Sequence, residues 1–120
     1  MNKKKFPPVS QELLIPCDVD STLIFDAASD DVEAIQMNYY GKEKWCRPSH
    51  KHIEFLHSLR ERGYYIIVWS GNGKQWADEV VDKLGIRSLI SQTMMKPLKY
   101  IDDLDCKEWM GTQIYLEEEN

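Results

Sequence analysis

The chain has 120 residues, of which 42% are hydrophobic and 29% are charged. This length and composition are typical of one globular domain and not of a disordered protein. The net charge of −5 disfavours an extended nucleic-acid groove, because such grooves are usually basic. No apolar run reaches the roughly 18 residues of a membrane span, so we expect a soluble, cytoplasmic protein with no membrane partner.

The two ends of the chain and its cysteines set further limits. Residues 3–5 are basic, but two prolines follow them in place of the apolar segment of a signal peptide. We expect a single domain over residues 1–120, with a tail over residues 1–11 and an acidic end over residues 117–120. Three cysteines lack the spacing of a disulfide framework or a zinc site, which favours reduced thiols. They are Cys17, Cys46 and Cys106.

Two apolar runs predict buried strands, and two amphipathic segments predict helices. The first strand is expected over residues 13–17, and the second, rich in β-branched and aromatic side chains, over residues 65–69. A helix is expected over residues 49–62, where apolar side chains recur at steps of three and four residues. A second helix is expected from residue 74 up to Gly85, which ends it.

The remaining segments predict three short strands and a hairpin. The strands are expected at residues 88–90, 99–101 and 113–116. Strands that alternate with amphipathic helices predict a mostly parallel sheet in an α/β layer fold. Residues 35–45 interrupt this alternation and predict a hairpin that turns near Gly41, within a small flap over residues 25–47.

Polar side chains follow the expected strands at the edge where α/β sheets bind ligands. Asp18 and Asp20 follow the first strand two residues apart, so their side chains point the same way and favour a hard cation such as Mg²⁺. Ser70 and Gly71 follow the second strand and precede a helix, an arrangement that favours phosphate. Lys96, which precedes a proline, is suited to neutralise phosphoryl charge.

A second acidic pair completes the pattern. Asp102 and Asp103 follow the fourth expected strand, where a carboxylate can bind a metal ion. In order, the motifs Asp-x-Asp-x-Thr-Leu, Ser-Gly, Lys-Pro and Asp-Asp closely resemble those of the haloacid dehalogenase-like (HAD) phosphohydrolase superfamily. The resemblance covers roughly residues 12–105, and all four motif positions are filled.

The resemblance implies a three-layer Rossmann-like fold with a parallel sheet of about five strands in the order 5-4-1-2-3. Only residues 91–99 join the third expected strand to the fourth, so we expect an extended crossover in place of a helix. Because that link is short, Lys99 is the alternative to Lys96 at the phosphate. The large cap of many relatives is absent, and only the small flap follows the first strand.

The resemblance also implies a mechanism. Asp18 would attack phosphorus to form an aspartyl-phosphate, while Asp20 would protonate the leaving group and then deprotonate the hydrolytic water. Ser70, Gly71 and Lys96 would bind the phosphoryl oxygens. The protein would thus be a phosphatase, that is, a phosphomonoester hydrolase.

The cofactor that the resemblance implies is Mg²⁺. Its ligands would be the Asp18 carboxylate, the Asp20 backbone carbonyl and Asp102, with Asp103 binding the metal or supporting its ligands. Thr22 would support the loop. Transfer of the phosphoryl group to another alcohol would use the same residues, because only the acceptor of the aspartyl-phosphate changes.

An open site fits a bulky phosphate ester, or a small one enclosed by a second copy in a homo-oligomer. The acidic charge favours a nucleotide, a sugar phosphate or a phosphorylated end over long nucleic acid. Aromatic side chains of the flap either stack on such a substrate or pack the hairpin onto the domain. They are Tyr39, Tyr40 and Trp45.

Two other interpretations of the motifs stay open. The first is a HAD-like domain that binds phosphate and Mg²⁺ without turnover. The second is a receiver-like signalling module, which would need a phosphate-accepting aspartate at a strand end between Asp20 and Ser70. The only aspartates in that interval fall in the expected flap, at Asp26, Asp30 and Asp31.

Overall fold

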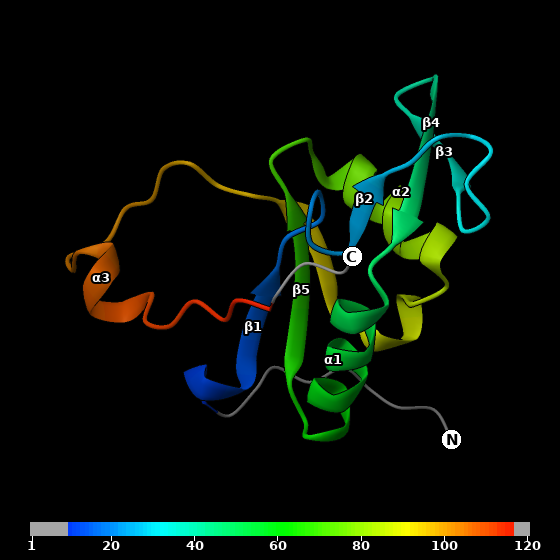
Figure 1. Ribbon diagram of the computed structural model, residues 1–120. Helices are drawn as coiled ribbons and strands as arrows, with labels where there is room; N and C mark the ends of the chain where they lie inside the picture. The colour runs from blue at the N-terminus through cyan, green and yellow to red at the C-terminus, as the bar shows by residue number, and fades with distance from the viewer. Residues whose placement is uncertain (1–9, 117–120) are drawn as a thin grey trace.

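A three-stranded parallel sheet forms the centre of the structure, a computed structural model that describes residues 10–116 (Figure 1). β5 (Tyr65–Ser70) is the middle strand, with β1 (Leu14–Cys17) on one side and β6 (Gln92–Met95) on the other. Buried and half-buried residues alternate along β5, as expected for a strand whose two faces have different environments. Because the three strands are parallel, their carboxyl ends meet at one edge of the sheet.

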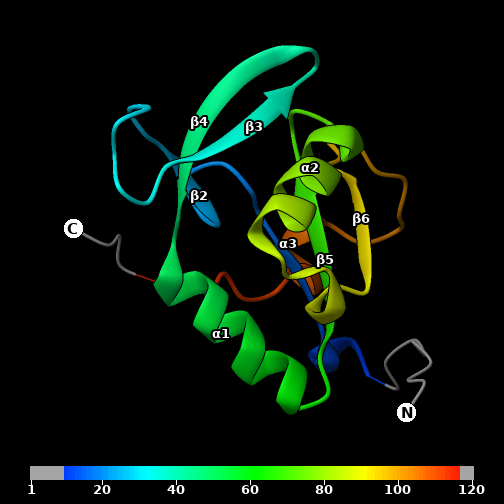
Figure 2. The same ribbon diagram turned by 90° about the vertical axis from the view of Figure 1, so that its right-hand side faces the viewer.

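Two helices cover one face of this sheet (Figure 2). α1 (His50–Glu61) precedes β5, and α2 (Lys74–Leu84) connects β5 to β6. Ile66 and Val68 belong to the buried core, and both are 0% exposed. The amphipathic patterns that predicted both helices are confirmed, and α2 ends as expected at Gly85, whose φ of 69° is left-handed.

A second, antiparallel sheet forms the flap, which packs beside α2 (Figure 2). Its strands are β2 (Ile24–Asp26), β4 (Lys42–Pro48) and β3 (Ile35–Tyr39), in that spatial order. The predicted hairpin is confirmed, since β3 and β4 are joined at Tyr40 and Gly41. Both turn residues have positive φ, 51° and 90°, as the tightest hairpin turns require. The sequence pattern did not reveal β2, which pairs with β4.

The expected five-stranded parallel sheet in the order 5-4-1-2-3 is wrong. Within residues 10–116 the parallel sheet has three strands, and the other three strands belong to the antiparallel flap. Residues 88–90 do not form a strand, because Arg87–Leu89 is a 3-10 helix whose Arg87 side chain binds Asp82 of α2. The third parallel strand is β6, which uses residues that the prediction placed in an extended crossover.

The two C-terminal strands of the prediction are also absent from the described residues. Residues 99–101 and 113–116 belong to an arm over residues 96–116 that projects beyond β6 and returns toward β1 (Figure 1). Ile101 is fully exposed and Tyr115 is 78% exposed. The two segments hold only two and three consecutive apolar residues, which bury too little surface to offset the entropy of ordering a strand.

The arm has local contacts of its own. It contains α3 (Cys106–Trp109), a single turn of helix. The Tyr100 ring lies edge-on to the Trp109 ring, with centroids 5.7 Å apart, and the Tyr100 hydroxyl accepts a hydrogen bond from the Cys106 N–H at 2.8 Å. These contacts join parts of the arm to each other and not to the parallel sheet.

The remaining described elements are short. Gln11–Leu13 is a 3-10 helix that leads into β1. No helix within residues 10–116 has both the length and the apolar character of a membrane span. Most of the expected N-terminal tail and the acidic end over residues 117–120 lie outside the described residues.

Candidate functional site at the carboxyl edge of the parallel sheet

The chain makes a tight turn immediately after β1. The Val19 carbonyl accepts hydrogen bonds from the N–H groups of three following residues, at 2.9 to 3.3 Å. They belong to Thr22, Leu23 and Ile24. Val19 is fully buried, whereas Asp18 and Asp20 on either side of it are half-buried. The turn therefore anchors one residue in the core and leaves the two carboxylates at the carboxyl edge of the sheet.

Asp18 presents an accessible carboxylate. Its side chain is 40% exposed, and one oxygen, Oδ1, lies 3.9 Å from the Lys96 ammonium nitrogen. The Thr22 hydroxyl donates a hydrogen bond to the other oxygen, Oδ2, at 3.4 Å. A carboxylate with this exposure is available to a ligand, and the nearby cation suits a ligand that carries negative charge.

Asp20 is held by two donors from the region around the start of α2. The Asn72 side-chain amide donates a hydrogen bond to Oδ2 at 2.9 Å, and the Trp76 indole N–H donates one to Oδ1 at 3.3 Å. Each oxygen of the carboxylate thus has one neutral donor. Asp20 is far more constrained than Asp18, although the two residues are separated only by Val19.

Ser70 ends β5 and is 1% exposed. Its hydroxyl oxygen accepts a hydrogen bond from the Asn72 N–H at 2.9 Å, and its carbonyl accepts from the N–H groups of Gly73 and Lys96 at 3.1 and 2.9 Å. The Ser70 hydroxyl keeps its own proton to donate. Gly71 is exposed and has open space around its Cα, so a ligand can approach the backbone there.

The structure brings four of the sequence-predicted residues into one connected group. Lys96 contacts Asp18 through its side chain and Ser70 through its backbone, while Asn72 joins Ser70 to Asp20. Lys96 is the first residue after β6, and its N–H still pairs with β5, so the end of this strand places it at the site. Lys99, the alternative, lies further along the exposed arm.

Asp102 and Asp103 do not join this group. Both are exposed residues of the arm, and an Asp102 carboxylate oxygen accepts a hydrogen bond from the Leu104 N–H at 2.9 Å. That backbone hydrogen bond, together with the neighbouring Asp103, lowers the pKa of Asp102. Across residues 10–116, histidine, cysteine and acidic side chains nowhere gather in groups of three or more that could bind a metal.

The residues present therefore fit part of the expected Mg²⁺ site. Mg²⁺ keeps several waters and is usually bound by one or two carboxylates together with phosphate oxygens. The exposed Asp18 carboxylate meets that requirement, and the adjacent Asp20 residue supplies a second group of oxygens. The ligands expected from Asp102 and Asp103 are not at this edge of the sheet.

The flap reaches the site through its turn. The Tyr40 hydroxyl donates a hydrogen bond to the Asn72 carbonyl at 2.5 Å, and Tyr39 lies edge-on to Trp76, with ring centroids 4.9 Å apart. A Cβ at Gly73 would overlap the Tyr40 hydroxyl, and the φ of Gly73 is +109°. Glycine at this position thus allows the flap to contact the loop after β5.

Two residues at the site, Asn72 and Trp76, are not assigned to it by the sequence pattern. The pattern places Asn72 in a turn and Trp76 in the core, and it leaves Tyr40 either stacking on the substrate or packing the hairpin onto the domain. The signal for Asn72 is its place in Ser-Gly-Asn-Gly, where the only amide side chain follows the predicted phosphate loop. The helical pattern gives no sign that the Trp76 indole N–H has a polar role, because Trp76 is 1% exposed and fits the pattern as a core residue.

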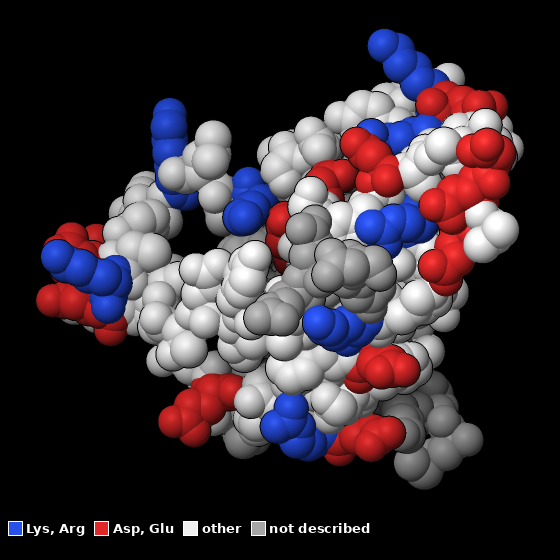
Figure 3. All heavy atoms as spheres, in the orientation of Figure 1, with Lys and Arg blue, Asp and Glu red and all other residues white. Residues whose placement is uncertain are grey.

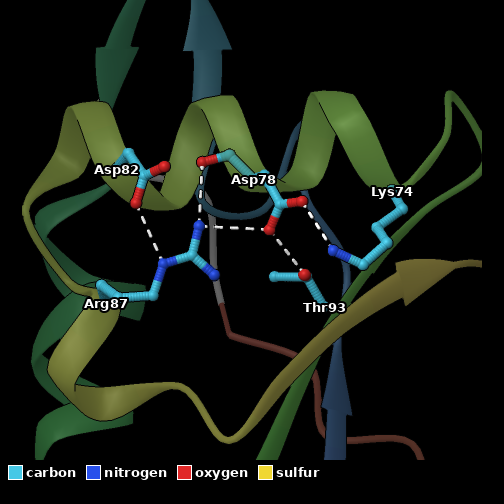
Figure 4. Close-up of polar contacts among 5 residues, drawn as sticks. All are labelled: Lys74, Asp78, Asp82, Arg87 and Thr93. Carbon is cyan, nitrogen blue, oxygen red and sulfur yellow. Dashed lines mark hydrogen bonds and ion pairs between the residues drawn. The ribbon is translucent and has the colours of Figure 1, made fainter.

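A separate polar cluster lies between α2 and β6 (Figure 4). Asp78 accepts hydrogen bonds from Lys74, Arg87 and Thr93 at 2.7, 3.1 and 2.6 Å. Burial by itself would raise the pKa of Asp78, but these three donors outweigh it and hold the pKa below its ordinary value. The cluster joins α2 to β6, and it thereby fixes the strand that leads to Lys96.

A surface groove lies away from this site. It runs between the flap and α2, has a volume of about 330 Å³, and is lined in part by Asn38, Lys42 and Lys83. It shares no residue with the Asp18 site. The candidate site lies at the carboxyl edge of the parallel sheet, where the Asp18 side chain is 40% exposed.

No protein-family model matches this chain, and no curated protein matches it either. The resemblance to the HAD-like superfamily therefore rests on the four motifs and their order.

Proposed function

We propose that the protein is a HAD-like phosphatase that hydrolyses phosphate monoesters through an aspartyl-phosphate on Asp18. The observation that carries this proposal is the pairing of the exposed Asp18 carboxylate with the Lys96 ammonium, 3.9 Å away, beside the constrained carboxylate of Asp20. A nucleophile, a cation for the phosphoryl group and a separate acid–base residue are the groups that this reaction needs.

In the first step, an Asp18 carboxylate oxygen attacks phosphorus and forms a new P–O bond. The bond from phosphorus to the ester oxygen breaks, and the ester oxygen keeps the electron pair of that bond. Asp20 gives this oxygen a proton. Lys96 neutralises charge on the phosphoryl oxygens, and the exposed Gly71 backbone and the Ser70 hydroxyl donate hydrogen bonds to them.

In the second step, water attacks the phosphorus of the aspartyl-phosphate. The water gives its proton to Asp20, the P–O bond to Asp18 breaks, and inorganic phosphate leaves. Asp18 and the Asp20 carbonyl would hold Mg²⁺, which when bound neutralises phosphoryl charge. Asp102 and Asp103 have no part in this scheme because they lie in the arm.

The substrate class follows from charge and access. Basic and acidic side chains are interspersed over the face in Figure 3, with no continuous basic stripe for a long nucleic acid, and the net charge is −5. The site is an open edge with Tyr40, 47% exposed, beside it. A nucleotide, a sugar phosphate or a phosphorylated end fits this surface. The free thiols at all three cysteines are consistent with a cytoplasmic enzyme.

The test is phosphate release from an aryl phosphate, with Mg²⁺ or with EDTA, by the wild type and by Asp18→Asn. We expect release by the wild type with Mg²⁺ and none from either EDTA-treated protein or the variant. Asp30→Asn is the matched control, because it removes one exposed carboxylate of the flap segment away from the site. An Asp18→Asn protein as active as wild type would overturn the proposal, and Mg²⁺ binding without release on any phosphate ester would favour a binding-only domain.

A further inference from the structure

We propose that Asn72 and Trp76 are positioning residues, which hold the Asp20 carboxylate in the orientation for proton transfer to the leaving group. This inference rests on the proposed phosphatase function and adds two residues that neither the motifs nor the resemblance assigns. It concerns the neutral donors around Asp20, not the groups that contact the phosphoryl group.

The two donors approach Asp20 from different directions. Asn72 lies in the loop after β5 and donates to Oδ2, while Trp76 lies in the first turn of α2 and donates to Oδ1. Two hydrogen bonds to different oxygens oppose rotation about the Cβ–Cγ bond of the aspartate. Each carboxylate oxygen accepts at two positions, so one position on each stays open for the proton that is transferred.

Both donors are themselves fixed. The Trp76 ring is 1% exposed, and its indole has Tyr39 edge-on at a centroid distance of 4.9 Å. The backbone of Asn72 is held at both polar groups, since its N–H donates to the Ser70 hydroxyl and its carbonyl accepts from the Tyr40 hydroxyl. Positioned donors of this kind set the orientation of an acid without a large movement during reaction.

The flap completes the arrangement. Tyr39 and Tyr40 are adjacent residues at the turn end of the hairpin, and one contacts Trp76 while the other binds Asn72. The hairpin thus acts on Asp20 through both positioning residues. A flap whose side chains merely packed against α2 would not need the hydrogen bond to the Asn72 carbonyl.

Trp76 is also the largest fully buried side chain among residues 10–116, so its loss can act through stability alone. Trp76→Phe keeps an aromatic ring and removes the indole N–H, and Asn72→Ala removes the side-chain amide. The control is Trp109→Phe, because the Trp109 ring contacts Tyr100 of the arm and not Asp20. Thermal unfolding of each variant identifies any that fail to fold.

The experiment compares two substrates whose leaving groups differ in their need for a proton. 4-Nitrophenolate leaves readily without protonation, whereas phenolate from phenyl phosphate depends more on the acid. We expect both Trp76→Phe and Asn72→Ala to lower kcat on phenyl phosphate about tenfold more than on 4-nitrophenyl phosphate, a fraction of the roughly 10²-fold that acid catalysis supplies. KM should stay within about twofold, because neither residue contacts the phosphoryl group. Equal losses on the two substrates would overturn the positioning role and leave the phosphatase function intact.

A second measurement does not depend on turnover. The indole N–H of Trp76 gives its own resonance in a ¹H–¹⁵N NMR spectrum, and Trp76→Phe assigns it. We expect this resonance to move upfield in Asp20→Ala, because the carboxylate acceptor is lost, and to stay in place in Asp30→Ala. An unmoved resonance overturns the inference. If the resonance moves in Asp20→Ala but the wild-type protein releases no phosphate from any ester, the contact is supported and the phosphatase function is rejected.

Discussion

The Lys96 ammonium lies 3.9 Å from the Asp18 carboxylate, although the two residues follow strands at opposite edges of the parallel sheet. The distance is bridged because the Lys96 N–H donates to the Ser70 carbonyl at the end of the middle strand. That hydrogen bond continues the β5–β6 ladder one residue past Met95, so Lys96 begins beside the middle strand and its side chain covers the remaining gap. The lysine of the Lys96-Pro97 motif thereby lies near the carboxylate of Asp18, a residue more than seventy positions earlier in the chain.

The first prediction concerns the two lysines after β6. Lys96→Met removes the cation near Asp18 and keeps most of the side-chain length, and we expect kcat/KM on an aryl phosphate to fall by about 10²-fold. Lys99→Met alters a residue of the exposed arm and should change kcat/KM by less than about twofold. Steady-state kinetics of both variants show which lysine binds the phosphoryl group. A larger loss of kcat/KM in Lys99→Met than in Lys96→Met would show that it is Lys99.

The second prediction concerns the contact between the flap and the loop after β5. Gly73→Ala introduces a Cβ against the Tyr40 hydroxyl at a backbone φ of +109°, so we expect a loss of about 1–3 kcal/mol in the free energy of unfolding. Gly71→Ala is the control, since a Cβ at that position would have no atom within 4 Å. Urea denaturation measures both.

Tyr40→Phe separates the two causes of that loss. Removing the hydroxyl relieves the overlap at position 73 but leaves the backbone strain, so the double variant Tyr40→Phe/Gly73→Ala should be less destabilised than the two single changes added together. Strict additivity would mean that the alanine does not meet the flap.

The third prediction concerns the pH dependence of stability through Asp78. Its pKa in the folded protein is held below the ordinary value of 3.8, so the carboxylate stabilises the fold above that value. The stabilisation is lost as the pH falls through the lower, folded pKa. Asp78→Asn should cost roughly 1–3 kcal/mol near neutral pH, since three donors lose a charged acceptor.

The same variant should therefore lose less stability than the wild type on acidification. Chemical denaturation at neutral pH and at about pH 3 measures this difference. Asp82→Asn is the comparison, because Asp82 also binds Arg87 but lies on the exposed side of α2. Parallel pH profiles for wild type and Asp78→Asn would contradict the assignment.

The elements that periodicity describes were predictable. β5 alternates in burial, α1 and α2 have apolar stripes, and Gly85 stops α2 with a left-handed φ. These signals are local in the sequence, so they predict the elements without knowledge of the tertiary structure. The C-terminal strands carried no comparable signal, because short apolar runs such as residues 99–101 become strands only if a neighbouring strand and a buried face are available.

The site was predictable in its residue types and not in its connections. The acid pair and the serine follow predicted strands, and parallel strands end together, so Asp18, Ser70 and Asp102 were expected at one edge. Lys96 was expected at the phosphate from the resemblance alone, and Asp102 lies in the arm instead. The hydrogen bonds from Asn72 and Trp76 to Asp20 depend on how α2 begins relative to β1, which lies more than fifty residues earlier. No local pattern encodes that relationship.

The fourth prediction concerns the reactivity of the three thiols. Burial, with a smaller contribution from the Asp18 charge, raises the pKa of Cys17 to about 12, and burial raises the pKa of Cys46 to about 11. Because the thiolate is the reactive form, both should resist alkylation at mildly alkaline pH, whereas the exposed Cys106 should react. Iodoacetamide treatment followed by mass spectrometry should add one group to the native wild type, none to Cys106→Ser, and three to the wild type in denaturant. Rapid modification of Cys17 in the native protein would mean that β1 opens readily beside Asp18, and the site would then be less ordered than its hydrogen bonds indicate.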